Sequence, residues 1–151
     1  RRFEGLDVRN GKLYMTTKRD KLLFIFDLDT FTFESSSTKS GAFDGQPDQI
    51  RSILQDELNN AAEPDISILY FCEDTVNGAT FAGVHGRDPD GKFYTILSTD
   101  QIRGETSGLA FSPDNRFMYV SFYAAGLVYE IWRIDGFPFG GQRLDIKYHE
   151  G

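Results

Sequence analysis

The 151-residue sequence predicts an all-β chain of β-propeller-like antiparallel blades. Three observations carry the prediction: a repeated strand-turn-strand unit, turn residues between apolar runs, and many aromatic residues. The 14 Phe and 7 Tyr residues favour strands. Three copies of about 45 residues indicate about three blades. Because propellers close with roughly four to eight blades, we expect these blades to belong to a larger propeller. An antiparallel sandwich is the alternative fold.

The first repeat covers about residues 1–40 and contains "EGLDVRNGKLYMTTKRDKLLFIFDLDT". A Gly-Leu strand leads to a turn at Asn10-Gly11, a pair that supplies the positive φ angles of a tight hairpin. A Tyr-centred strand follows at 13–15, and a third strand is expected at 22–28. The third repeat, about residues 104–140, has the same order in "SGLAFSPDNRFMYVSFYAAGLVYEIWRIDG", with its third strand expected at 127–134.

The middle repeat, about residues 45–100, is less regular. "QPDQIRSIL" stands at the Gly-Leu strand, "ISILYFCED" at the Tyr strand, and "FAGVHGRDPDGKFYTIL" supplies two further strands around an Asp-Pro-Asp-Gly turn. A last strand is expected at 142–149, where it would close the propeller against another blade. Residues 1–151 are therefore interpreted as a single partial β-propeller domain.

Composition argues against several partners and sites. The formal net charge of −7 argues against nucleic acid, because binding phosphates needs clustered Lys and Arg. No apolar run approaches the roughly 20 residues of a membrane span. A single cysteine excludes an intrachain disulfide framework and a cysteine-rich zinc site. Cys72 follows three apolar residues, and we expect a buried free thiol there.

Acidic residues begin the first strand of each repeat. Glu4, Asp48 and Glu105 stand at or just before these strands. When the Gly-Leu strands are aligned, Asp48 is level with Glu4 and Glu105 lies two residues earlier. Since the innermost strand of a blade lines the channel, three carboxylates from three blades are expected to converge. Carboxylate oxygens suit Ca²⁺ or Mg²⁺. The alternative is that these acids are solvated turn residues.

The candidate site also includes Glu73, His85 and Arg87. Glu73 and Asp74 end the Tyr strand of the middle repeat, and only one of them can face a given side because side chains alternate. Glu73 is taken as the fourth metal ligand, with a solvated turn as the alternative. His85 and Arg87 are candidate substrate contacts, through acid/base chemistry and a bidentate phosphate contact. A structural histidine and a surface ion pair are the alternatives.

Three stretches resemble the PhoX-type alkaline phosphatase family. "ETSGLAFSPDNRFMYVSF" is similar to its C-terminal signature, "RFEGLDV…GKLYM" to an earlier blade strand preceded by an acid, and "GQPDQI…LYFCED" to its Pro-Asp segment. The resemblance runs from about Phe3 to Phe139 and covers the C-terminal portion of such a protein.

The resemblance implies a six-bladed, exported propeller that hydrolyses phosphate monoesters with Ca²⁺ and a second metal such as iron. It puts the metal ligands at Glu4, Asp48, Glu73 or Asp74, and Glu105. The expected function is therefore metal-dependent phosphoester hydrolysis of a small phosphorylated substrate. The alternative is a non-catalytic binding or assembly module in a larger complex, whose exposed strand edges need other protein chains or the remaining blades.

Overall fold

The computed structural model describes residues 2–43, 46–53, 68–75 and 82–139, and they form three antiparallel sheets of three or four strands. The first sheet has β1 (Phe3–Arg9), β2 (Lys12–Thr17), β3 (Leu22–Asp27) and β4 (Phe33–Ser37). The second has β5 (Gln46–Ile53), β6 (Ile68–Asp74), β7 (Val84–Arg87) and β8 (Phe93–Leu97). The third has β9 (Thr106–Phe111), β10 (Phe117–Phe122) and β11 (Leu127–Trp132).

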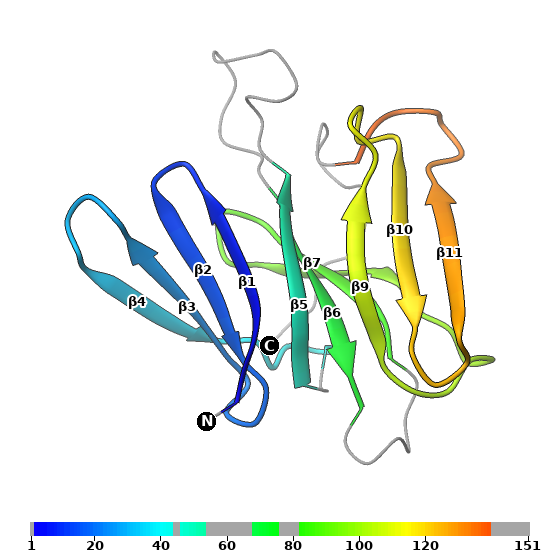
Figure 1. The fold of residues 1–151 in the computed structure, drawn as a ribbon, viewed down its shortest axis with the longest axis horizontal. Helices are drawn as coiled ribbons and strands as arrows, with labels where there is room; N and C mark the ends of the chain where they lie inside the picture. Colours follow the sequence, from blue (N-terminus) through cyan, green and yellow to red (C-terminus); the bar gives the residue numbers. More distant parts are fainter. Residues whose placement is uncertain (1, 44–45, 54–67, 76–81, 140–151) are drawn as a thin grey trace.

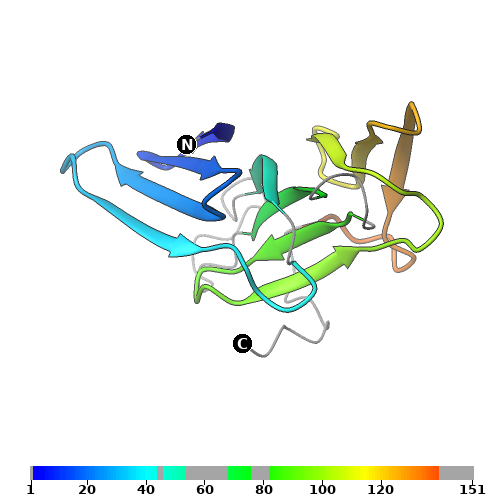
Figure 2. The same ribbon diagram turned by 90° about the horizontal axis from the view of Figure 1, so that it is seen from below.

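The sheets are blade-like, as the sequence predicted, and each is a meander in chain order (Figure 1). Their first strands, β1, β5 and β9, run side by side in one direction, and the sheets fan out from them (Figure 2). The predicted third strands at 22–28 and 127–134 end slightly earlier, at Asp27 and Trp132. The strand predicted at 142–149 lies outside the described residues.

The predicted turns form as their residues dictate. Asn10 and Gly11 have φ angles of 46° and 69° between β1 and β2. Between β7 and β8, the Gly91 amide donates to the Asp88 carbonyl at 3.0 Å, and the Lys92 amide donates to the Asp88 carboxylate at 2.8 Å. The Asp-Pro-Asp-Gly segment is therefore a hairpin turn whose acid is used by its own backbone.

Two apolar clusters join the three sheets. The cluster between the first and second sheets contains Leu23, Ile25, Phe43, Ile50, Leu69, Phe71 and Phe93, with Tyr14 packed beside it. The cluster between the second and third contains Ile53, Ile68, Tyr70, Cys72, Val84, Leu109, Met118, Val120, Phe122 and Phe139. The second sheet is thus covered on both faces, which explains why all seven residues of β6 are buried.

The tyrosines in the second strands of the first and second sheets both point toward the sheet that follows in the chain. Tyr14 in β2 packs toward the second sheet, and Tyr70 in β6 packs toward the third. The neighbouring Leu69 packs on the opposite face, toward the first sheet. We call the two sides of a sheet its Tyr face and its Leu face. Each internal interface therefore joins the Tyr face of one sheet to the Leu face of the next.

Because the three sheets pack in a row, the first and third sheets each keep one apolar face that no other sheet covers in the described residues. The first-sheet face is the Leu face of the first sheet, and the strand register places on it Leu6, Val8, Leu13, Met15, Phe24, Phe26 and Phe33. The third-sheet face is the Tyr face of the third sheet and carries Ala110, Phe117, Tyr119, Val128 and Trp132. Within the described ranges, no sheet packs on either face (Figure 2).

Candidate functional site

The first strands of all three sheets contain a register shift at the matching place. In β1 it lies between Phe3 and Leu6, and in β5 between Pro47 and Ile50. In β9 it falls where β10 passes from Tyr119 to Ser121. A bulge re-aims side chains at a strand end. The first two bulges contain Glu4 and Asp48, so the alignment that put these acids level is consistent with the register.

Close packing of β1 on β5 brings the two acids together. A Cβ atom on Gly5 would lie 2.4 Å from the Asp48 carbonyl oxygen, so only glycine allows this approach. The Thr16 hydroxyl accepts a hydrogen bond from the Gly5 amide at 2.9 Å and donates one to the Asp48 carbonyl at 3.0 Å. Thr16 is fully buried and links the first two sheets beside the acids.

A matching threonine holds the end of β6. The Thr106 hydroxyl accepts from the Glu73 amide at 2.9 Å and lies 2.6 Å from the Gly83 carbonyl. This contact ties the first strand of the third sheet to the strand end that carries Glu73 and Asp74. The acids therefore stand on backbone segments fixed by buried hydrogen bonds between sheets.

The structure separates the two acids that end β6. Glu73 is 3% exposed and its carboxylate accepts from the Gly83 amide at 3.0 Å and lies 3.0 Å from His85 Nε2. Asp74 instead forms an ion pair with Lys18. Asp74 also influences the pKa values of Asp48 and Glu105, so it lies close to both acids. Glu73 as a metal ligand stays a prediction, and Asp74 is the acid that joins the cluster.

Lys18 was not among the sequence-predicted site residues. Its ammonium group contacts the Asp74 carboxylate and lies 3.9 Å from Glu105 Oε2. Burial opposes its charge, but the hydrogen bond to Asp74 and the surrounding carboxylates hold the pKa of Lys18 above its usual value. In the sequence, Lys18 follows Tyr14 by four residues, and Asp74 follows Tyr70 by four residues. Aligning the two tyrosines therefore places Lys18 and Asp74 at equivalent positions, a signal from which both could have been predicted.

We call Glu4, Lys18, Asp48, Asp74 and Glu105 the acidic cluster. Burial raises the pKa of Asp48; Lys18 opposes the rise, and the charges of Glu4 and Asp74 add to it. A side-chain hydrogen bond with Asp74, then burial, raises the pKa of Glu105 to about 7. The acidic cluster therefore holds more negative charge than Lys18 neutralises.

His85 and Arg87 do not join the acidic cluster. His85 is 1% exposed, stacks on the Phe43 ring at 4.4 Å, and lies 3.3 Å from the Thr95 hydroxyl. Arg87 pairs with Leu69, five residues before Asp74 on β6, or roughly 17 Å along the strand. Both stay predictions as substrate contacts.

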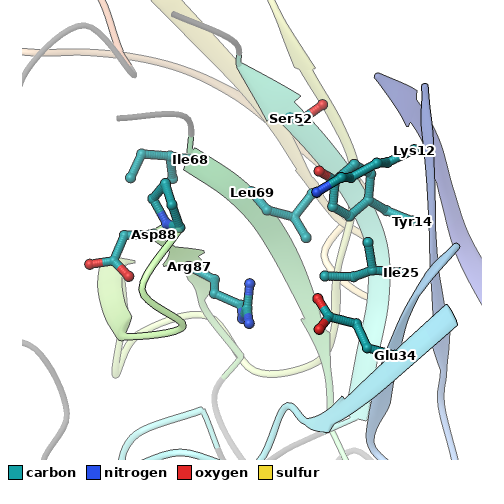
Figure 3. Close-up of a pocket in the computed structure, with 10 residues that line it drawn as sticks. Lys12, Tyr14, Ile25, Glu34, Ser52, Ile68, Leu69, Arg87 and Asp88 are labelled. Carbon is teal, nitrogen blue, oxygen red and sulfur yellow. The ribbon is translucent and has the colours of Figure 1, made fainter. Parts of the chain in front are cut away.

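Arg87 instead lines a pocket between the first and second sheets (Figure 3). The pocket has a volume of about 140 Å³, and Lys12, Tyr14, Glu34 and Asp88 also line it. Arg87 Nε is buried there, and no described residue forms a hydrogen bond with it. Lysine and arginine in this lining are balanced by two carboxylates, so its charge does not select an anion.

Cys72 is a buried free thiol, as predicted, and burial raises its pKa to about 12. Among residues 2–43, 46–53, 68–75 and 82–139, no three His, Cys, Asp or Glu side chains stand close enough to hold one metal ion. In the same ranges, no helix is long and apolar enough to cross a membrane.

The Glu105 pKa predicts how stability depends on pH. The folded-state pKa of about 7 lies above the usual glutamate value of 4.5, so the folded chain binds more protons between these values than the unfolded chain. Stability is therefore expected to fall as pH rises from about 4.5 to 7. Glu105→Gln should flatten this slope and raise the melting temperature more at pH 8 than at pH 5.

Thermal unfolding from pH 4 to pH 8.5, followed by circular dichroism, measures this effect. Glu34→Gln is the matched control, because Glu34 is an exposed carboxylate on β4 away from the acidic cluster. The control should keep the wild-type slope. Equal pH profiles for wild type and Glu105→Gln would contradict the assigned proton site.

Comparisons with protein-family models, curated proteins and solved structures found no match. The resemblance to PhoX-type phosphatases therefore stays a prediction carried by the quoted motifs.

Proposed function

We propose that the acidic cluster binds a divalent cation, Ca²⁺ in the first place, and that the chain uses it to hydrolyse phosphoesters. The observation that carries the proposal is the gathering of Glu4, Asp48, Asp74 and Glu105 from three sheets at one end of the first strands. Carboxylate oxygens are the ligands that Ca²⁺ takes. The donor chemistry and the excess negative charge suit a hard cation, which would have to draw the carboxylates together, because within the described residues no three of them stand close enough to hold one ion.

The position of each residue in the acidic cluster suggests a different role in cation binding and hydrolysis. Asp48 and Asp74 are the most buried of the four acids and stand on backbone tied between sheets, so we assign them the cation. Glu105 exchanges a proton near neutral pH, which suits a group that moves protons at a site. Lys18 carries the positive charge that a phosphate monoester would meet. A bound cation would polarise a phosphoryl oxygen.

Calorimetric titration of the chelator-treated chain with CaCl₂ tests the cation site. Binding is expected at pH 8 and should weaken at pH 5.5, where protons compete with Ca²⁺ for the Glu105 carboxylate. Asp48→Asn should weaken binding by about tenfold or more, because calcium affinity follows the number of charged ligands. Glu34→Gln should bind as wild type. No heat of binding at pH 8 would refute the cation site.

Hydrolysis is tested separately with p-nitrophenyl phosphate. Turnover is expected only with Ca²⁺ and should disappear in Asp48→Asn. Calcium binding without turnover would refute the hydrolase and leave a cation-binding module.

A second candidate, a non-catalytic assembly module, is favoured by a different observation. On the first-sheet face, Leu6 is 63%, Val8 54% and Phe33 63% exposed. Large exposed apolar patches mark interaction surfaces. At high dilution, the chain should bind an apolar dye, and Val8→Lys should weaken dye binding without lowering the melting temperature. Dye binding that is absent or unchanged in the variant would contradict an accessible face.

A further inference from the structure

We propose that a pocket at the ends of the first strands binds a phosphate group, at a site separate from the acidic cluster. The strands β1, β5 and β9 run in one direction, so the acids lie where these strands begin and the pocket lies where they end (Figure 1). Along β1, Glu4 and Arg9 are five residues apart, or roughly 17 Å. The inference goes beyond the proposed hydrolase, because this pocket needs no cation.

All three sheets contribute to this pocket, which we call the arginine pocket. Arg9 comes from β1, Arg51 and Ser52 come from β5, and Ser112 and Asn115 lie in the turn between β9 and β10. The volume is about 220 Å³, whereas pockets for drug-sized ligands measure roughly 300–1,000 Å³. The arginine pocket therefore suits one small anion, or one anionic group of a larger molecule.

The charge of the lining selects an anion. Arg9 and Arg51 line the arginine pocket, and no carboxylate among the described residues does. By contrast, two carboxylates line the pocket that contains Arg87. A guanidinium group presents a planar fork of N–H donors that matches the oxygen atoms of a phosphate group. Two such groups from neighbouring strands indicate phosphate recognition.

Asp7 fixes the positions of the two arginines. It is 7% exposed and does not line the pocket. Its Oδ1 atom lies 3.9 Å from Arg9 Nε and 3.5 Å from Arg51 Nη1. Its Oδ2 atom accepts hydrogen bonds at 2.6 Å from both the amide and the hydroxyl of Ser52. Asp7 is thus held on β5 and keeps both guanidinium groups beside one another, at the edge of the pocket.

Asn115 adds a buried polar group to the lining. The residue is 6% exposed. Its backbone amide donates to the Ser112 carbonyl at 2.9 Å, and its carbonyl accepts from the Phe139 amide at 2.7 Å. Within the part of the chain that the structure describes, no hydrogen bond uses the Asn115 side-chain amide. Buried polar groups are normally hydrogen-bonded, so this amide, which can donate two hydrogen bonds, points to a ligand in the pocket.

Titration of the ¹⁵N-labelled chain with sodium phosphate at pH 8, followed by amide chemical shifts, tests the arginine pocket. A chelator is present and NaCl keeps the ionic strength constant, so the outcome does not depend on the cation site. Saturable shifts are expected at the amides of Ser52, Ser112 and Asn115. The absence of saturable shifts, or shifts centred on Lys18, would overturn the proposal.

Sodium acetate distinguishes phosphate from carboxylate recognition. It should bind at least about tenfold more weakly, because a phosphate group carries about twice the charge of a carboxylate at this pH. Equal affinities for the two anions would contradict a phosphate site.

Arg51→Gln should weaken phosphate binding by about tenfold or more, because it removes charge-assisted hydrogen bonds to the anion. Arg116→Gln is the matched control. It changes the net charge equally, but Arg116 is exposed, lies near Asp114 and does not line the pocket. The control should bind phosphate as the wild type does. Equal losses in the two variants would mean a general attraction of anions and would overturn the site.

Asn115→Asp tests the contribution of the side-chain amide. Aspartate has nearly the same size and tolerates the left-handed backbone of this position, where φ is 55°, but its carboxylate repels a phosphate group. Binding should be lost while circular dichroism shows an unchanged fold. Wild-type affinity in this variant would contradict the proposal. If the variant does not fold, Arg51→Gln still decides, because the Arg51 side chain is 45% exposed.

Discussion

Phe71→Ala is expected to lower the free energy of unfolding by about 3–5 kcal/mol, the usual range for truncating a buried phenylalanine. Phe71 is fully buried, and its ring centroid lies 5.5 Å from that of Phe43 and 5.8 Å from that of Phe93. These rings belong to the cluster between the first and second sheets. Because whole domains are stable by only about 5–15 kcal/mol, this loss is a large share of the total stability.

Urea denaturation followed by circular dichroism measures the loss, and Phe31→Ala is the control. Phe31 is 88% exposed, so its truncation should change stability by less than about 0.5 kcal/mol. Similar losses in the two variants would mean that the cluster does not hold the first two sheets together.

Thr16→Val is expected to lower the free energy of unfolding by about 2–4 kcal/mol. The substitution keeps the shape of the side chain but leaves the Gly5 amide and the Asp48 carbonyl buried without their hydrogen-bond partner. Each such group costs about 1–3 kcal/mol. Since these bonds fix the backbone of Asp48, calcium binding should weaken in the same variant.

The adjacent Thr17 supplies a matched control. It is as buried as Thr16, but its hydroxyl has no hydrogen-bond partner among the residues that the structure describes. Thr17→Val should therefore be neutral or slightly stabilising, because it removes a polar atom from an apolar site. Urea denaturation gives the stability difference, and amide exchange of Gly5 reports the local loss. Equal effects of the two substitutions would contradict the link through Thr16.

Much of the fold could be predicted because the sequence repeats. Alternation around Tyr14, Tyr70 and Tyr119 identified the second strands, and Asn10-Gly11 identified a hairpin, since both signals are local. The strand β4 carried no clear signal: Phe33 is its only large apolar residue, followed by an acid and three serines. Its position is set by pairing with β3, which local propensity does not reveal.

The acidic cluster was predicted in part. Glu4, Asp48 and Glu105 were found from their places before the first strands, and their mutual electrostatic influence agrees with a shared end. Asp74 was not chosen over Glu73, and Lys18 was missed. The choice depends on the ion pair between Lys18 and Asp74, two residues 56 positions apart, which forms only when the first and second sheets have packed.

The sequence by itself determined the class of structure, the order of the strands and the ends at which acids accumulate, because alternation and turn chemistry act over a few residues. Only the tertiary structure decided that the Tyr face of one sheet meets the Leu face of the next, that Thr16 and Thr106 join neighbouring sheets, and that Asp74 pairs with Lys18 while Glu73 turns to His85. These contacts join residues 12 to 56 positions apart, so their geometry exists only once the sheets have packed.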